Sequence, residues 1–178
     1  MLNRYSLAGL LVLLYFSCNS VNQKTNSIKP GWHKLTLPNG WIVYAPKSFT
    51  SSNLRGVDSA PGSIVSKTDS VNLQFDSGQS DHNENCSADK KIKYATDEID
   101  TGFYRTYYHI PYQHTAAIDT IDNKIAVIVK PTKIGKGTVG IEIYGCKNQP
   151  WLGITGENLT AKQEALVLDI FKTIRNSK

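Results

Sequence analysis

Hydrophobic and polar residues alternate along much of the chain, and the alternation is clearest between Val71 and Asp76. Val71, Leu73 and Phe75 are apolar, and the residues between them are polar. A period of two places alternate side chains on opposite faces of a β-strand, so the pattern predicts a strand with one buried and one solvated face. Strands of this kind are typical of antiparallel sheets.

Other short runs rich in β-branched and aromatic residues predict further strands. These runs are Trp32–Leu37, Trp41–Tyr44, Ile64–Lys67, Phe103–Ile110, Thr115–Ile121, Lys124–Lys130 and Thr138–Tyr144, with shorter ones at Lys91–Ala95 and Trp151–Thr155. The first two runs are separated by Pro38, Asn39 and Gly40, which predict a tight hairpin because Asn and Gly tolerate positive φ. The residues between Pro46 and Pro61 predict a loop, with a helical turn near Phe49–Leu54.

One helix is predicted, at the C-terminal end of the chain. Thr160 is a suitable N-cap, and Gln163 stands three residues later, as a capping box requires. Apolar residues then recur at helical spacing at Val167, Ile170, Phe171 and Ile174. We therefore expect the Asn158–Lys178 segment to be a helix whose apolar stripe lies on the sheet, with Phe171 buried. The expected fold class is α+β: an antiparallel sheet of about six or seven strands with this C-terminal helix packed on it.

The first residues follow a different pattern. They carry a cation at Arg4, an apolar run over Leu7–Phe16, the small Ser17, then Cys18 and polar residues. This is the order of a secretory signal peptide. The apolar run is too short to cross a bilayer, which takes roughly 20 apolar residues. We therefore predict that residues 1–17 are a signal peptide.

The junction between Ser17 and Cys18 resembles the lipobox of bacterial lipoproteins. The resemblance implies that the Cys18 thiol receives a diacylglycerol and that Cys18 becomes the new N-terminus, attached to a membrane. The alternative is an ordinary secreted protein cut near Ser20. No acidic run resembling the surface-export signal of Bacteroidetes lipoproteins follows Cys18, which favours the outer membrane and its periplasmic side.

Residues 18–30 are predicted to be a lipidated N-terminus and a flexible tether, because Val21 and Ile28 are their only aliphatic residues. Residues 31–178 are then one globular domain, long enough to bury a core. The chain has a formal net charge of +5, with its lysines dispersed rather than clustered. Dispersed charge on an exported protein argues against nucleic acid as a partner.

The chain has 3 cysteines. If Cys18 carries lipid, Cys86 and Cys146 are the pair that remains, and an oxidising compartment predicts a disulfide between them. The alternative is two unpaired thiols in a domain that is stable without a bridge. His82 near Cys86 could suggest a thiol nucleophile, but exported cysteines pair more often than they catalyse.

Other candidate sites are weak. Gly135–Thr138 resembles part of a phosphate-binding loop, but a predicted strand follows it instead of a helix, so we expect a turn. His109, His114 and Asp119 could meet at a metal, but the spacing of the two histidines fits no common zinc pattern, so solvent-facing histidines are favoured. We predict no catalytic site, no metal and no cofactor.

The most distinctive composition lies in Phe103–His114, which holds four tyrosines: Tyr104, Tyr107, Tyr108 and Tyr112. Tyrosine offers a large amphipathic contact area, so this cluster could bind a saccharide or a protein partner. The favoured alternative is that the tyrosines fill the two layers beside the sheet.

Three stretches give the mature domain a resemblance to the PsbP and Mog1-like superfamily. They are Trp41, Pro46 and Phe49 after the first hairpin, Asp76–Gly78 at the end of an alternating strand, and Asn158–Arg175. The resemblance implies a sheet sandwiched by helices and an accessory or partner-binding role, with no catalytic residue. The expected function is that of a membrane-anchored, non-catalytic accessory lipoprotein that binds an envelope protein. The alternative is a ligand-binding module that uses the tyrosine-rich strand.

Overall fold

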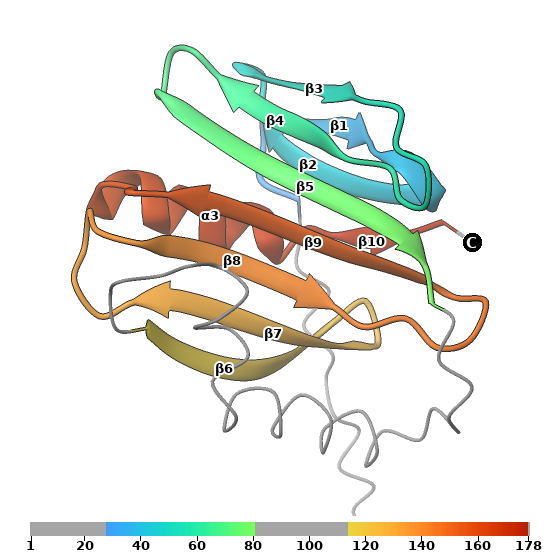
Figure 1. Ribbon diagram of the computed structural model, residues 1–178. Helices are drawn as coiled ribbons and strands as arrows, with labels where there is room; N and C mark the ends of the chain where they lie inside the picture. Colours follow the sequence, from blue (N-terminus) through green and yellow to red (C-terminus); the bar gives the residue numbers. More distant parts are fainter. Residues whose placement is uncertain (1–27, 81–113, 178) are drawn as a thin grey trace, which may run out of the picture.

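A computed structural model describes residues 28–80 and 114–177, and these residues form strands in two antiparallel sheets and one α-helix (Figure 1). The small sheet has the order β1 (Trp32–Thr36), β2 (Trp41–Pro46), β10 (Arg175–Asn176). The large sheet has the order β3 (Phe49–Asn53), β4 (Gly62–Ser66), β5 (Val71–Gln79), β9 (Pro150–Glu157), β8 (Thr138–Ile143), β7 (Lys124–Pro131), β6 (His114–Ile121). The helix is α3 (Ala161–Phe171).

The predicted first hairpin is confirmed, and its turn has the expected conformation. Residues Pro38–Gly40 form the tight turn between β1 and β2. Asn39 has φ 58° and Gly40 has φ 81°, left-handed values that Gly adopts freely and Asn adopts more readily than most residues with a Cβ atom. The β6–β7 hairpin has the same chemistry, since Asp122 and Asn123 have φ 51° and 59°. Both turns therefore contain residue types that tolerate positive φ.

One face of the large sheet, which we call the inner face, carries the main core. On β5, Val71, Leu73 and Phe75 are buried while Asn72 and Gln74 are exposed, so the predicted alternation is confirmed. Residues paired in register share a face, which continues the inner face through β9, β8 and β7. Buried members of the same core come from the small sheet and from α3: Leu35, Trp41, Val43, Val167, Ile170 and Phe171. Both elements therefore lie on the inner face.

Helix α3 begins as predicted but ends earlier. The Thr160 side chain accepts a hydrogen bond from the Gln163 N–H and the Gln163 side chain accepts one from the Thr160 N–H, so the capping box is confirmed. The prediction that the helix fills Asn158–Lys178 is wrong, because the helix ends at Phe171 and β10 pairs with β2. The edge of β2 offers backbone partners that a longer helix would leave unpaired.

The Thr173 hydroxyl stabilises the turn from α3 into β10. It accepts a hydrogen bond from the Tyr44 N–H at 2.9 Å and lies 2.7 Å from the Ile170 carbonyl oxygen and 3.0 Å from that of Tyr44. The last turn of α3 is thereby joined to β2.

The predicted helical turn at Phe49–Leu54 is also wrong, because this segment forms strand β3. Each residue of β3 pairs with a residue of β4, and Phe49 is buried in the core. The sequence of β3 lacks the alternation that predicts a strand. Most of its residues are polar, and only its first residue is buried. In its coarse form the predicted class is confirmed: the described residues are mostly β, with a large antiparallel sheet and a C-terminal helix packed on it.

Candidate functional site

Most of the site residues predicted from the sequence lie outside the described residues. This holds for the lipid attachment residue, one disulfide cysteine, one histidine and the tyrosine cluster: Cys18, Cys86, His109, Tyr104, Tyr107, Tyr108 and Tyr112. The predictions made for them stay predictions.

Cys146 lies within the described residues, just after β8, and is 8% exposed. The loop that follows it is joined to the end of β5, since the Asn148 N–H donates to the Ser80 carbonyl oxygen and the Ser80 N–H donates to that of Gln149, both at 3.0 Å. Ser80 precedes Cys86 by only six positions, so the chain between them can span about 20 Å when extended. The topology is therefore compatible with the Cys86–Cys146 disulfide, which stays a prediction.

His114 and Asp119 do not come together. Both lie on β6, at an even and an odd position, so their side chains leave opposite faces of the strand. The Thr138 N–H donates to His114 Nε2 at 3.0 Å, which joins the first residues of β6 and β8. Within residues 28–80 and 114–177, no group of three or more His, Cys, Asp or Glu residues is placed to hold a metal.

The Gly135–Thr138 segment is a turn, as predicted. Gly135 and Gly137 have φ 78° and 108°, and the segment leads directly into β8. A Cβ atom on Gly137 would stand 2.8 Å from His114 Nε2, so the glycine also makes room for the imidazole. No helix N-terminus follows that could hold a phosphate.

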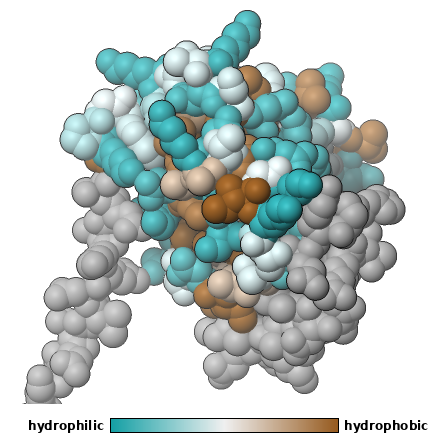
Figure 2. Space-filling model, turned by 90° about the vertical axis from the view of Figure 1, so that its left-hand side faces the viewer, coloured by the Kyte–Doolittle hydropathy of each residue, from teal (hydrophilic) through white to brown (hydrophobic). Residues whose placement is uncertain are grey.

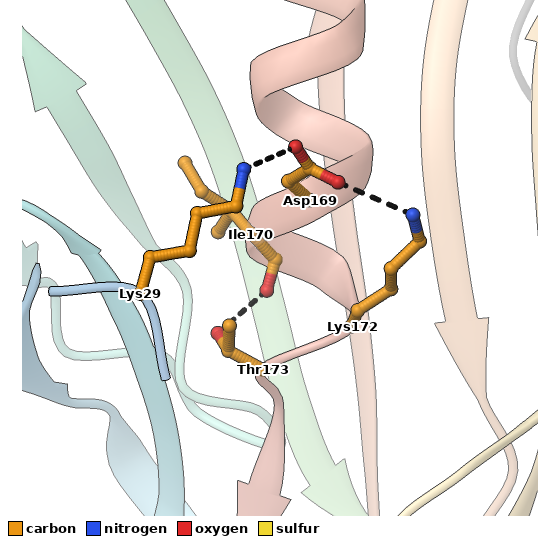
Figure 3. Close-up of polar contacts among 5 residues, drawn as sticks. All are labelled: Lys29, Asp169, Ile170, Lys172 and Thr173. Carbon is orange, nitrogen blue, oxygen red and sulfur yellow. Dashed lines mark hydrogen bonds and ion pairs between the residues drawn. The ribbon is translucent and has the colours of Figure 1, made fainter. Parts of the chain in front are cut away.

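One cluster that the sequence did not predict lies where the predicted tether meets the domain. We call it the tether-exit site: Lys29, Trp32, Asp169 and Lys172. Lys29 Nζ lies 2.6 Å from one carboxylate oxygen of Asp169, and Lys172 Nζ lies 3.2 Å from the other (Figure 3). Lys29 Nζ is also 5.2 Å from the centroid of the Trp32 ring, within the range of a cation–π contact. The last part of the predicted tether is thus held against α3.

The charges of the tether-exit site are half exposed. The Lys29 contact is the main reason why the pKa of Asp169 lies below its ordinary value; burial acts against this, and the Lys172 contact supports it. The Lys29 and Lys172 side chains are 53% and 54% exposed. Ion pairs this accessible each contribute at most about 1 kcal/mol. The site can therefore position a chain segment, and it contains no nucleophile beside a base.

A turn directs the chain from this site into β1. The Trp32 N–H donates to the Lys29 carbonyl oxygen at 3.1 Å, and Gly31 has φ 81°. Pro followed by Gly at the centre of a turn is the sequence signal for this geometry, so the turn itself was predictable from Pro30 and Gly31. The ion pair between Lys29 and Asp169 was not predictable, because 140 positions separate the two residues.

A second polar cluster fixes the β4–β5 turn to the start of α3. The Ser66 and Ser48 hydroxyls each donate to Asp69 Oδ2 at 2.7 Å. The Gln163 side chain donates to the carbonyl oxygens of Asp69 and Ser70, each at 2.9 Å. These contacts join three segments that are far apart in sequence. The hydrogen bond from Ser66, followed by that from Ser48, lowers the pKa of Asp69.

Asp69→Asn should lower the free energy of unfolding at pH 7 by about 1 kcal/mol, because an amide oxygen accepts the two hydroxyls more weakly than a carboxylate. The folded-state pKa is lowered, so this contribution is present above the unfolded value near 3.9 and is lost as pH falls through the folded value. Urea unfolding at pH 7 and at about pH 2 should show the two proteins converging in acid. Asp58→Asn, in an exposed loop, is the control; an equal loss there would contradict the role of Asp69.

Few large hydrophobic residues are exposed on the described part of the chain. Figure 2 shows hydrophilic side chains over most of one face, with a small hydrophobic group near its centre. The exposed large hydrophobic residues of the described part of the chain are Ile28, Leu54, Val57, Ile118 and Ile134, and only Leu54 and Val57 share a loop. Apolar residues exposed singly are normal on a protein surface.

Comparisons with known proteins leave the family open. No protein-family model matches the chain, and no curated protein matches its sequence. Within the described part of the chain, α3 is the one α-helix, and no helix there is long and apolar enough to span a membrane.

Proposed function

We propose that the protein is a lipid-anchored lipoprotein of the cell envelope and that its domain is a non-catalytic accessory module that binds another envelope protein. The signal pattern over Leu7–Phe16 and the lipobox-like junction at Cys18 support the anchor. The observation that carries the proposal is the tether-exit site. It holds Lys29 against α3 only eleven positions after Cys18.

The length of the free tether sets the position of the domain. A flexible segment of about ten residues has an end-to-end distance of about 20 Å. A lipid on Cys18 would therefore keep the tether-exit site close to the headgroups. Lys29 and Lys172 would then face the bilayer, and cations near an anionic surface are favourable.

Mass spectrometry of the mature N-terminus tests the anchor. We expect a peptide that begins at Cys18 and carries lipid, and Cys18→Ser should abolish this modification and release the protein from membranes. More than one acyl chain is needed for lasting attachment. Ser17→Ala, which keeps a small residue before the cysteine, is the matched control and should be processed normally. An unmodified terminus at Asn19 or Val21 would refute the anchor.

A pulldown from detergent-solubilised envelope tests the accessory role. We expect a stoichiometric protein partner. Binding to a glycan array that is lost in Tyr107→Ala would instead favour the saccharide-binding alternative.

We propose further that the domain is a PsbP and Mog1-like member. Trp41, Phe49 and the Asn158–Arg175 segment, which carry the resemblance, contribute to the core and to α3. An antiparallel sheet with a C-terminal helix on its inner face supports the assignment. An experimental structure of residues 31–178 that lacks helices on both sides of the sheet would refute it.

A further inference from the structure

The face of the small sheet that points away from the core is both apolar and basic. Leu35, Trp41 and Val43 belong to the core, so the residues that alternate with them point outward. Residues paired in register share this outward face. We call it the basic–aromatic face: Trp32, Lys34, Thr36, Ile42, Tyr44, Pro46 and Arg175. Each of these residues is at least partly exposed.

The composition of this face differs from that of an ordinary solvated sheet face. Such a face is usually polar, and β5 of the large sheet follows the rule, with Asn72 and Gln74 exposed. The basic–aromatic face instead offers a Trp, a Tyr, an Ile and a Pro beside two cations, and β1, β2 and β10 contain no Asp or Glu. Trp and Tyr are enriched where proteins meet a membrane surface, and Lys and Arg are attracted by anionic headgroups.

The basic–aromatic face is continuous with the tether-exit site. Trp32 belongs to both: it is packed against the core and remains partly exposed. The tether-exit site adds Lys29 and Lys172, which approach the Asp169 carboxylate from two sides (Figure 3). Together the face and the site hold four cations and this one carboxylate. Ile28, which precedes Lys29, is 44% exposed. The chain therefore enters the domain at the edge of a basic surface that also exposes apolar side chains.

The Arg175 guanidinium is held at the edge of this face. Its Nη1 atom donates to the carbonyl oxygens of Lys172 and Ile174, at 3.1 and 2.6 Å. These bonds fix the side chain beside the end of α3. Because an arginine has five N–H donors, Arg175 keeps donors for a phosphate group.

We propose that the basic–aromatic face docks on the surface of an anionic bilayer. This inference rests on the proposed lipid anchor and names the face of the domain that meets the membrane. A lipid on Cys18 and a free tether with an end-to-end distance of about 20 Å bring the tether-exit site, and the face beside it, to the headgroups. The rings of Trp32 and Tyr44 then lie at headgroup level, and Lys34 and Arg175 meet lipid phosphates.

Vesicle flotation of the full mature chain carrying Cys18→Ser tests the face in the absence of the lipid. Binding through the face alone should be weak, with a dissociation constant on the order of millimolar lipid, so the lipid concentration must be high. We expect the chain to float with vesicles of phosphatidylethanolamine and phosphatidylglycerol, and not with vesicles of phosphatidylethanolamine and phosphatidylcholine. Lys34→Gln should weaken the binding about fivefold, because one cation at the anionic surface is lost.

Lys133→Gln is the matched control. It removes the same charge from the exposed turn between β7 and β8 and leaves the basic–aromatic face intact. We expect a change of less than about twofold, because salt screens a cation that is far from the bilayer. Equal losses for the two substitutions would overturn the proposal, since binding would then follow net charge alone. Because the tested chain carries no lipid, an unmodified N-terminus in the native protein would refute the anchor without changing this result.

Photo-crosslinking in isolated envelope membranes identifies what the face contacts. A photo-crosslinking phenylalanine replaces Tyr44 in the full-length protein, and a second protein carries it in place of Gln74, which is exposed on β5. We expect lipid adducts from position 44 and not from position 74. Adducts from position 44 to another protein would show that the face binds a protein partner. Lipid adducts in equal yield from both positions would show that no face is preferred. Either result would overturn the proposal.

Discussion

Phe171→Ala should lower the free energy of unfolding by about 3 to 5 kcal/mol, since truncating a buried Phe removes its transfer free energy and leaves a cavity. Phe171 is the last residue of α3, is 0% exposed, and belongs to the core that joins the helix to both sheets. This core contains residues of both sheets and of α3, and hydrogen-bonded strands cannot easily move into a cavity. For a domain of this size the melting temperature should fall by on the order of 10 °C, measured by calorimetry or circular dichroism.

Lys172→Ala is the matched control, one position further along the chain. Its side chain is 54% exposed and its ion pair with Asp169 is open to solvent. We expect a change within about 0.5 kcal/mol. Equal effects of the two substitutions would mean that α3 does not dock through Phe171.

Gly62→Ala should also destabilise the domain strongly, by about 3 kcal/mol, because the new methyl group has no room. A Cβ atom at Gly62 would overlap with the Phe75 ring and with the Ser52 carbonyl oxygen. Phe75 is buried on the next strand, and Ser52 belongs to the backbone of β3, so neither can move away cheaply. Strands β3 and β4 would have to separate. Urea unfolding of both proteins measures the loss.

Gly153→Ala controls for the general effect of placing alanine in a strand. No atom lies within 4 Å of the position that its Cβ would take. Gly153 does not have a positive φ, so its backbone conformation suits alanine as well. Removing a glycine there reduces the freedom of the unfolded chain, so stability should stay level or rise by less than about 1 kcal/mol. A loss as large as that of Gly62→Ala would show that backbone conformation, rather than crowding, limits these positions.

The elements with strong local signals were predicted correctly. Val71, Leu73 and Phe75 repeat with period two, and Thr160 with Gln163 forms a capping box, so neighbouring residues alone carry the information. Asn39 and Gly40 likewise specify a turn through their own φ preferences. The errors fall where pairing with another strand decides the conformation. The polar β3 is a strand because β4 pairs with it, and Arg175–Asn176 leaves the helical pattern because the edge of β2 is free to pair.

The candidate site likewise has one part that the sequence predicts and another that only the fold brings together. The signal pattern around Cys18 predicts an anchor from sequence order alone, since export depends on a linear segment. The tether-exit site could not be found this way, because Lys29 gains its partner only when α3 is brought beside the start of β1. The pairing of Cys86 with Cys146 depends likewise on distance in space.

The sequence by itself determined the strands with a clear period, the turn residues and the start of the helix, because each depends on the chemistry of adjacent residues. For the same reason it supports a prediction of export and anchoring, which stays a prediction. Only the tertiary structure decided that the strands divide into two sheets, where α3 ends, and that Lys29 meets Asp169. The face of the sheet to which Val127 and Val129 belong also appears only there. In sequence these two valines look the same as those of the core, and register decides which face they occupy.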